Sequence, residues 1–319
     1  MKTIAKINRV CIIGGSGFVG CHIVSLLQTA GYAVRVPTRR FENAKDLTVL
    51  PDVEVLETDV HEPASLASLL RDMDAVINLT GILHEGSARH DSFQQVHVAL
   101  PRLITQTCLK QGVKRLLHMS ALNADLRSKS AYLRSKAQGE AFARSAALAV
   151  TVFRPSVIFG PGDAFLNQFA TLLRRLPVLP LACGDAKLQP IYVKDVARAL
   201  TSSLENPATF DQAYDLCGPT VYTLQQLVQN VSDWQQRRRL IFTLGKKAAY
   251  YQAWLLEKLP GKLMTRDDYN ALLGNSVCAG PFPAVFGFQP STVAAVAAQY
   301  LGPQAMGSPF DSWRSKARR

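Results

Sequence analysis

The chain has 319 residues, of which 48% are apolar and 19% charged, and its formal net charge is +12. These proportions are those of a globular protein with a substantial core, and they exclude a disordered chain or a fibre. Residues 235–319 hold 12 Lys and Arg against 4 Asp and Glu, so most of the positive excess lies there. No nucleic-acid-binding motif accompanies this charge, so we expect no DNA or RNA partner.

The six cysteines are scattered without a CxxC pair, and several fall inside apolar runs, where a thiol packs as a small hydrophobic side chain. This usage is typical of the reducing cytoplasm. The histidines form no HExxH motif and no zinc-ligand spacing with cysteine, so we expect no metal. No apolar run approaches the roughly 18 residues that span a bilayer, and residues 1–9 lack a secretory signal core. We therefore expect a soluble, cytoplasmic protein.

Strands and helices alternate along the first half of the chain. We expect strands at 10–13, 33–36, 53–56, 75–79, 115–119 and 150–153, and helices at 18–30, 65–71, 93–111 and 131–146. Because parallel strands need helical crossovers between them, this order predicts a doubly wound parallel sheet of the α/β class.

The regular alternation ends at Arg154-Pro155 and at the Gly160-Pro161-Gly162 turn. We expect a first domain over 1–155, to which residues 189–218 return as a helix and a further strand. Residues 156–319 then form a smaller, mostly helical cap for a substrate or a partner. Neither an internal repeat nor a low-complexity tract is visible.

A glycine-rich turn links the first strand to the first helix. Gly14, Gly17 and Gly20 form a GxxGxxG motif, completed by Phe18 and Val19 at the helix start. In this setting the first glycine permits a tight turn, the second lets the backbone approach a pyrophosphate, and the third lets the helix pack closely on the strand. The sequence therefore predicts a Rossmann dinucleotide site, the alternative being a plain glycine turn.

The end of the second strand indicates which dinucleotide is bound. An acidic residue there accepts hydrogen bonds from the ribose 2′-hydroxyl of NAD, but this chain reads Pro37-Thr38-Arg39-Arg40. Arg39 and Arg40 can pair with a 2′-phosphate through charge-assisted hydrogen bonds. NADP(H) is therefore favoured over NAD(H), unless the two arginines only form a solvated loop.

Two further strand ends contribute candidate cofactor contacts. Asp59 and Val60 follow the third strand, and Asn78, Thr80 and Gly81 follow the fourth. The alternatives are a surface turn at Asp59 and a loop cap at Asn78. Their places at the carboxyl edge of the sheet favour contacts with adenine and with the middle of the cofactor.

A serine, a tyrosine and a lysine form a candidate catalytic set. Tyr132 and Lys136 lie one helical turn apart, and Ser120 ends a strand twelve residues earlier. A neighbouring ammonium can lower a phenol pKa toward neutrality. We expect Tyr132 to exchange a proton, Ser120 to fix a carbonyl, and Lys136 to bind the nicotinamide ribose. The alternative is a set that only cradles the cofactor.

With these residues and Arg154-Pro155, the chain resembles the extended and atypical branch of the short-chain dehydrogenase/reductase superfamily. The segments 118–125, 132–136, 165–167, 189–196 and 264–267 resemble the NADPH-binding accessory subunits of respiratory complex I and their bacterial relatives. This resemblance implies NADP(H) binding, with Pro155 among the cofactor contacts, in a respiratory or quinone-linked context. Turnover within that family is often undemonstrated.

Two positions depart from the extended pattern. Val96-His97-Val98 stands where an Asn is common, and Ser120-Ala121-Leu122 lacks the acidic pair of sugar-nucleotide dehydratases. Dehydration is therefore disfavoured. The apolar run 172–181 suits an isoprenoid or lipid-like ligand, or else is an ordinary packed cap helix.

The stretch 246–263 combines lysines with Tyr250, Tyr251 and Trp254. It suits an anionic membrane surface or a partner subunit, whereas the simpler interpretation is a cap helix with a solvated basic side.

Together these features favour an NAD(P)H-dependent oxidoreductase linked to respiratory or ubiquinone metabolism, acting on an apolar or quinone-like substrate. One alternative is a non-catalytic NADPH-binding accessory or assembly protein of a respiratory or quinone-biosynthesis complex, peripheral to the inner face of the membrane. A second is an NAD(P)-dependent sugar-nucleotide epimerase.

Overall fold

The computed structural model describes residues 6–86, 90–145, 147–259 and 262–302. A seven-stranded sheet lies at its centre, in the order β11-β6-β5-β4-β1-β2-β3, and every pair in it is parallel. Its strands are β1 (Arg9–Ile13), β2 (Ala33–Thr38), β3 (Val53–Glu57), β4 (Ala75–Asn78), β5 (Arg115–Met119), β6 (Ala149–Pro155) and β11 (Gln212–Leu216). Chain order reverses between β1 and β4, and ligands of such sheets bind at this reversal.

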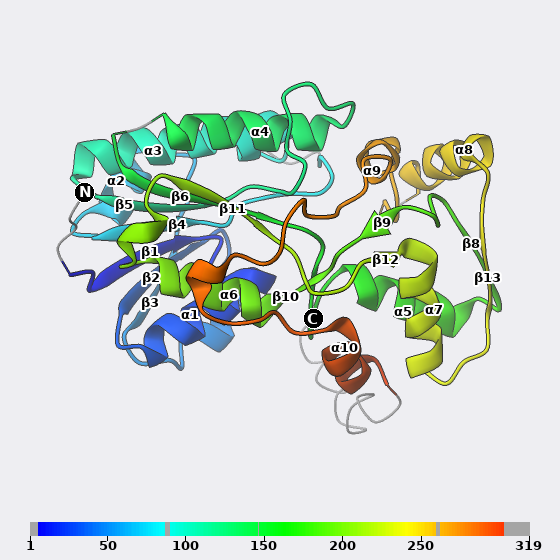
Figure 1. Cartoon of the computed structure of the whole chain (residues 1–319). Helices are drawn as coiled ribbons and strands as arrows, with labels where there is room; N and C mark the ends of the chain where they lie inside the picture. Colours follow the sequence, from blue (N-terminus) through cyan, green and yellow to red (C-terminus); the bar gives the residue numbers. More distant parts are fainter. Residues whose placement is uncertain (1–5, 87–89, 146, 260–261, 303–319) are drawn as a thin grey trace.

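Helices cover both faces of the sheet (Figure 1). One face carries α1 (Phe18–Thr29) and α6 (Val193–Ser203), and the other carries α2 (Pro63–Leu70), α3 (Leu100–Gln111) and α4 (Ala131–Arg144). Each layer encloses its own buried core, because both faces of the central strands are apolar. The predicted doubly wound α/β fold is confirmed.

The helix predicted over 93–111 begins with a π-helical turn, η2 (Gln94–Ala99), before α3. Pro101 explains the irregularity, because proline has no N–H to donate to the carbonyl of His97 four residues earlier. Gly139 of α4 packs against that same carbonyl, which a side chain at position 139 would strike. The π turn therefore brings η2 and α4 into close backbone contact.

A second lobe lies beyond the carboxyl edge of the sheet. Its core is enclosed by α5 (Phe165–Arg175), α7 (Leu224–Trp234) and α10 (Val293–Leu301), with α8 (Lys246–Glu257) and α9 (Arg266–Leu272) beside them. Within the described residues, no helix has the length and apolarity to cross a membrane. Three two-stranded ribbons complete the lobe: β7 (Ile158–Phe159) with β10 (Ile191–Tyr192), β8 (Val178–Leu181) with β13 (Leu240–Thr243), and β9 (Lys187–Leu188) with β12 (Tyr222–Thr223).

Three 3-10 turns, η1 (Phe41–Leu47), η3 (Pro207–Thr209) and η4 (Ala284–Phe286), lie in the connections. The turn η4 returns to the first lobe, where the Phe286 ring lies near the rings of Phe153 and Tyr214. The chain thus crosses between the lobes repeatedly, which fixes the cap against the sheet.

Two features differ from the sequence-based expectations. Cys217 and Cys278 form a disulfide across 61 positions, whereas we expected the cysteines to pack as thiols. A pairing so distant in sequence has no local signal. In the apolar run 172–181, Leu173, Leu179 and Leu181 are buried in the core of the second lobe. These three side chains are therefore packed core rather than a ligand lining, whereas Leu176 and Val178 of the same run are exposed.

Candidate functional site

The glycine turn lies between β1 and α1, at the reversal of strand order. Gly14 has a φ of +88°, and a Cβ there would lie 3.3 Å from the backbone of Leu79. Only glycine adopts this conformation without strain while touching the end of β4. Gly17 is the N-cap of α1 and has no side-chain cap, so the amide N–H groups of the first turn are available to an anion.

Gly20 makes the tightest approach of the turn. A Cβ at this position would collide with the carbonyl oxygens of Gly14 and Gly15, the latter at 2.5 Å. The absence of a side chain at Gly20 thus leaves space for the backbone of the glycine turn, whereas the sequence predicted close packing of the helix on the strand. The first helical residues, Phe18 and Val19, are half-buried, and Val19 packs on the core of this layer.

Both arginines after β2 are exposed. Arg39 reaches Asp91 at 3.4 Å, with 70% of its side chain accessible. The Thr38 hydroxyl donates to the Arg40 carbonyl, which fixes the turn that presents both guanidinium groups. Asp91 therefore stands where a 2′-phosphate would compete for Arg39.

Asp59 and Val60 have different surroundings. Asp59 is exposed and accepts a hydrogen bond from the His61 amide at 2.9 Å, as a turn residue does. The Nε2 atom of His90 lies 3.9 Å from the other carboxylate oxygen of Asp59, and the His90 ring stacks on the ring of His61. Val60 is half-buried and packs on the core beneath α2. The edge of β3 thus offers a stacked imidazole pair beside Asp59.

Asn78 is buried and organises the end of β4. Its amide oxygen accepts from the Thr80 amide at 3.1 Å and from the Thr80 hydroxyl at 2.6 Å, and its amide nitrogen lies 3.2 Å from His118 Nδ1. Asn78 is therefore a loop cap, one of the two readings of the sequence. The capped turn presents Thr80 and Gly81 at the carboxyl edge of the sheet.

Tyr132 and Lys136 lie one turn apart on α4, against the ends of β4 and β5. The Lys136 ammonium donates to the Met119 carbonyl at 2.8 Å and reaches the Thr80 carbonyl at 3.5 Å. A Cβ on Gly81 would be 3.6 Å from the same ammonium. The structure thus brings Tyr132, Lys136 and Gly81 together at the edge that also carries the glycine turn.

The proton affinities in this site differ from the simple expectation. Burial, with a further contribution from the Asp268 carboxylate, raises the pKa of Tyr132 to about 12. Burial also lowers the pKa of Lys136 to about 8. The expected lowering of the tyrosine pKa is absent because burial disfavours the phenolate and because the Asp268 carboxylate lies near the phenol. The Lys136 ammonium donates to two backbone carbonyls instead.

Ser120 is buried at the end of β5, and Pro155 is buried at the end of the neighbouring strand β6. The Ser120 hydroxyl has no hydrogen-bond partner of good geometry among the described residues. It nevertheless faces Glu140 closely enough to help Arg154 lower the pKa of that carboxyl, against the effect of burial. The Ser120 hydroxyl therefore lies near the Glu140 carboxyl of α4.

His97 is a site residue that sequence reasoning left without a role. Its Nε2 accepts a hydrogen bond from the Ile82 amide at 3.0 Å, and its Nδ1 lies 2.8 Å from the Ser135 hydroxyl. Ser135 in turn donates to the Tyr132 carbonyl at 2.7 Å. Burial and the Lys136 charge lower the pKa of His97 to about 3, so the ring is neutral. This network fixes the turn after β4 against α4.

Two aspartates of α9 close over the start of α4. Asp267 accepts from the Ser130 hydroxyl at 2.7 Å and from the amides of Ala131 and Tyr132. Asp268 caps α9 through Thr265 and contacts His84 at 2.7 Å. A carboxylate stabilises the positive end of a helix, so the cap holds the helix that carries Tyr132. The segment 264–267 contributes to the family resemblance, but the sequence does not indicate that Asp267 caps α4, because the two lie 136 positions apart.

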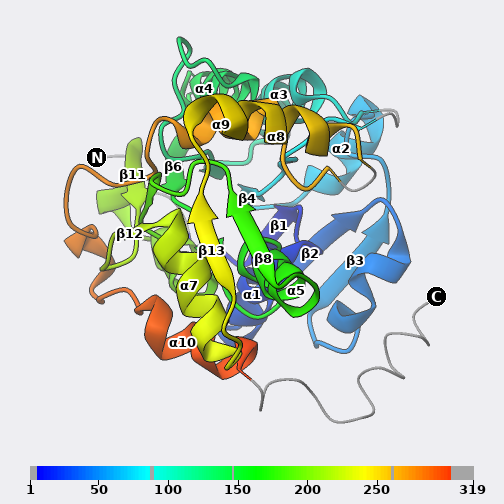
Figure 2. The same cartoon turned by 90° about the vertical axis from the view of Figure 1, so that its right-hand side faces the viewer.

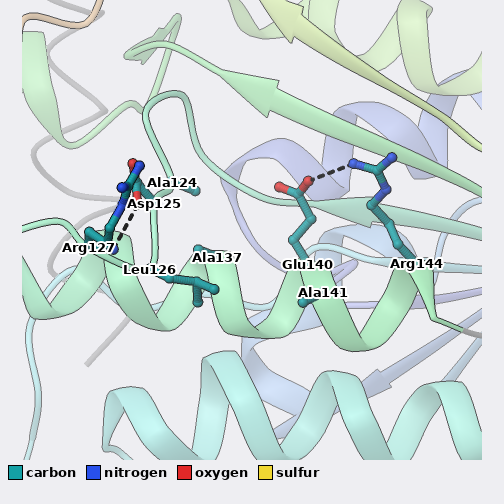
Figure 3. Close-up of a pocket in the computed structure, with 8 residues that line it drawn as sticks. All are labelled: Ala124, Asp125, Leu126, Arg127, Ala137, Glu140, Ala141 and Arg144. Carbon is teal, nitrogen blue, oxygen red and sulfur yellow. Dashed lines mark hydrogen bonds and ion pairs between the residues drawn. The ribbon is translucent and has the colours of Figure 1, made fainter.

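A surface pocket of about 610 Å³ lies between α4 and the loop of residues 124–127 (Figure 3). Asp125 and Arg127 line one end of it, and Glu140 and Arg144 form an ion pair at the other. Tyr132 and the glycine turn do not belong to its lining. This pocket is therefore distinct from the candidate cofactor site.

Comparison with known proteins extends this picture. The mouse (Mus musculus) NADH dehydrogenase [ubiquinone] 1 alpha subcomplex subunit 9, mitochondrial, is 34% identical over 226 residues, which cover 69% of this chain and 59% of the mouse protein. The chain therefore matches about three fifths of that relative's length. A ceramide reductase from Caulobacter vibrioides is 30% identical over 201 residues, or 62% of this chain and 61% of that protein.

Among solved structures, an NADPH-dependent quinone oxidoreductase from Escherichia coli, complexed with NADPH, superposes with a TM-score of 0.75. The match covers 92% of this chain and 99% of the other, at 19% identity, and it supports the shared fold. Residues 10–217, from β1 to just past β11, match the NAD dependent epimerase/dehydratase family. The chain belongs to that family, whose members bind NAD(P) on a Rossmann fold.

Proposed function

We propose that this protein is an NADP(H)-dependent oxidoreductase that reduces the carbonyl group of an apolar or quinone-like substrate in respiratory or quinone metabolism. The observation that carries this proposal is the placement of Tyr132 and Lys136 on α4, against the strand ends that follow the glycine turn. In this proposal residues 1–155 and 189–218 bind the dinucleotide, and residues 156–319 bind a substrate or a partner.

The residues present fit a dinucleotide. Gly14 and Gly20 leave room for backbone alone, and the uncapped first turn of α1 offers amide donors to a pyrophosphate. Arg39 and Arg40 would bind a 2′-phosphate, and Lys136 beside Gly81 would bind the nicotinamide ribose. When bound, the nicotinamide supplies the hydride. Asp59, Val60, Asn78, Thr80 and Pro155 complete the proposed surroundings of the cofactor.

The state of Tyr132 favours reduction over oxidation. A phenol with a pKa of about 12 keeps its proton at neutral pH and can donate it to the far more basic oxygen that forms as hydride reaches a carbonyl carbon. Oxidation would need the phenolate, which burial and Asp268 disfavour. Ser120 would position the carbonyl only after its side chain turns from Glu140.

The arginines after β2 supply a test of cofactor choice. Replacing Arg39 and Arg40 together by Ala should weaken NADPH binding roughly ten- to hundredfold, because a hydrogen bond to a charged group contributes about 1.5–3 kcal/mol. NADH binding should change little. Calorimetric titration of both cofactors measures this difference, with Arg127→Ala, at a 94% exposed side chain, as the control. Equal losses for NADPH and NADH would contradict the assignment.

Lys136 predicts a pH dependence. Its pKa is lowered to about 8, so the ammonium is charged below that pH and neutral above it. We therefore expect NADPH affinity to fall as pH rises through about 8, since the neutral amine is a weaker hydrogen-bond donor to the ribose and loses its attraction for the anionic cofactor. Titrations across this range measure it, and Lys136→Arg, which stays charged, should flatten the profile. An unchanged slope in that variant would show that another group titrates.

A second candidate is a non-catalytic NADPH-binding subunit or assembly protein of a respiratory complex. It is favoured by the relative named as a subunit of NADH dehydrogenase. It predicts cofactor retention through gel filtration without turnover of any carbonyl compound. A sugar-nucleotide epimerase is consistent with the family, and screening UDP-sugars for conversion tests it.

A further inference from the structure

The end of the second lobe that lies farthest from the sheet exposes large apolar side chains. On α8, Tyr251 is 68% exposed and Leu255 is 56% exposed, and Trp254 lies beside them at 41%. Their neighbours Ala249 and Ala253 are buried against Tyr269, so the helix is already packed on its other side. The exposed stripe is therefore an additional apolar surface that the core of this chain does not use.

The ribbon of β8 and β13 continues this surface. Its register pairs Leu240 with Val178 and Phe242 with Pro180. Leu240 is 62% exposed, and Val178 and Phe242 are exposed as well. The amide of Gln252 on α8 donates to the Pro180 carbonyl at 2.9 Å, which joins helix and ribbon. Figure 2 looks onto this end, with β8 and β13 side by side below α8. We call Tyr251, Trp254, Leu255, Val178, Leu240 and Phe242 the docking face.

Exposed basic side chains stand next to the docking face along the chain. Lys246 and Lys247 are exposed at the start of α8, and Arg174 and Arg175 are exposed at the end of α5. Lys258 lies over the Trp254 ring, with its ammonium 3.7 Å from the centroid. The acidic side chain of α8, Glu257, forms an ion pair with Arg266, whose Nε lies 2.9 Å from the Glu257 carboxylate. An apolar centre with this rim complements a surface that is apolar inside and negatively charged outside.

We infer that the docking face binds the surface of an anionic phospholipid bilayer. Tyrosine and tryptophan rings favour the boundary between headgroups and acyl chains. Lysine and arginine beside that boundary attract anionic headgroups. A protein partner would match the apolar centre, but the basic rim on both sides of it fits a uniformly negative surface better.

The docking face is coupled to the candidate site through α9. The rings of Tyr250 on α8 and Tyr269 on α9 make an edge-to-face contact with their centroids 5.7 Å apart. Tyr269 lies two residues after Asp267, which caps α4. A bilayer bound at α8 would therefore lie next to the cap over Tyr132. Bilayer binding does not require turnover, so an experiment on bilayer binding tests this inference separately from the proposed reaction.

Sedimentation of the full chain with vesicles tests this inference. We expect binding to vesicles of phosphatidylcholine mixed with phosphatidylglycerol, weak binding to phosphatidylcholine alone, and loss of binding as salt rises. In the double variant Tyr251→Glu/Leu255→Glu, the affinity for these vesicles should fall by about tenfold or more. The double variant Lys246→Glu/Lys247→Glu should lose the preference for anionic lipid. All four positions are exposed, so folding should be retained, as circular dichroism would verify.

The matched control is Val49→Glu/Leu109→Glu, which places two carboxylates at exposed apolar positions of the first lobe. It should bind vesicles like the unchanged protein. Equal binding by the Tyr251→Glu/Leu255→Glu variant, or no binding by the unchanged protein, would overturn the inference. A shift of that variant from dimer to monomer in gel filtration would instead assign the face to a second copy of the chain.

Discussion

Replacement of Tyr132 by Phe should lower kcat for carbonyl reduction by about 10²- to 10⁴-fold, the usual contribution of a positioned general acid. The variant removes only the hydroxyl, while the ring keeps its contacts with Phe93 and His97. Turnover of NADPH with a reducible apolar carbonyl compound measures the effect. The loss should appear in kcat rather than in KM, because the proton moves only in the transition state.

The control for this variant is Tyr222→Phe, which removes a phenol from the β9–β12 ribbon. It should leave kcat unchanged, and NADPH affinity should be the same in both variants. If Tyr132→Phe kept full turnover, another group would have to supply the proton, and the catalytic role of Tyr132 would be wrong.

Replacement of Gly20 by Ala should abolish NADPH binding and reduce the free energy of unfolding by about 3 kcal/mol. The added methyl would meet the carbonyl oxygen and carbon of Gly15, which are backbone atoms that cannot rotate away. The turn would have to open, and the amide groups at the start of α1 would lose their positions. Denaturant unfolding and NADPH titration measure the two effects.

Gly280→Ala is the matched control, because a methyl there would meet no heavy atom within 4 Å. It should leave both the free energy of unfolding and NADPH affinity unchanged. A Gly20→Ala protein that unfolds and binds NADPH like the unchanged chain would contradict the proposed turn geometry.

The sheet and the glycine turn were predictable because their signals are local. Apolar strands alternating with helices indicate a parallel sheet, and the spacing of Gly14, Gly17 and Gly20 matches a turn that needs those residues. The spacing of Tyr132 and Lys136 likewise places both on one side of α4. Each of these inferences rests on signals within short segments or on the order of consecutive segments.

The remaining features depend on contacts between distant parts of the chain. Asp267 caps a helix that begins 136 positions earlier, and the Cys217–Cys278 disulfide spans 61 positions. The direction of the Lys136 ammonium depends on the carbonyls of Met119 and Thr80, and the raised pKa of Tyr132 depends on burial of the phenol and on Asp268. Periodicity and motif spacing carry no information about such contacts, since the fold alone brings these groups together.

Transfer of deuterium from NADPH labelled at C4 of the nicotinamide tests the central proposal most directly. The purified protein would be incubated with this cofactor and a panel of apolar ketones and quinones, and the products analysed by mass spectrometry. We predict a deuterated alcohol from at least one ketone, or a reduced quinone with consumption of the labelled cofactor, and neither product in the Tyr132→Phe variant. Tight NADPH binding without consumption of label across the whole panel would contradict a reductase and leave the accessory subunit and the epimerase as the remaining candidates.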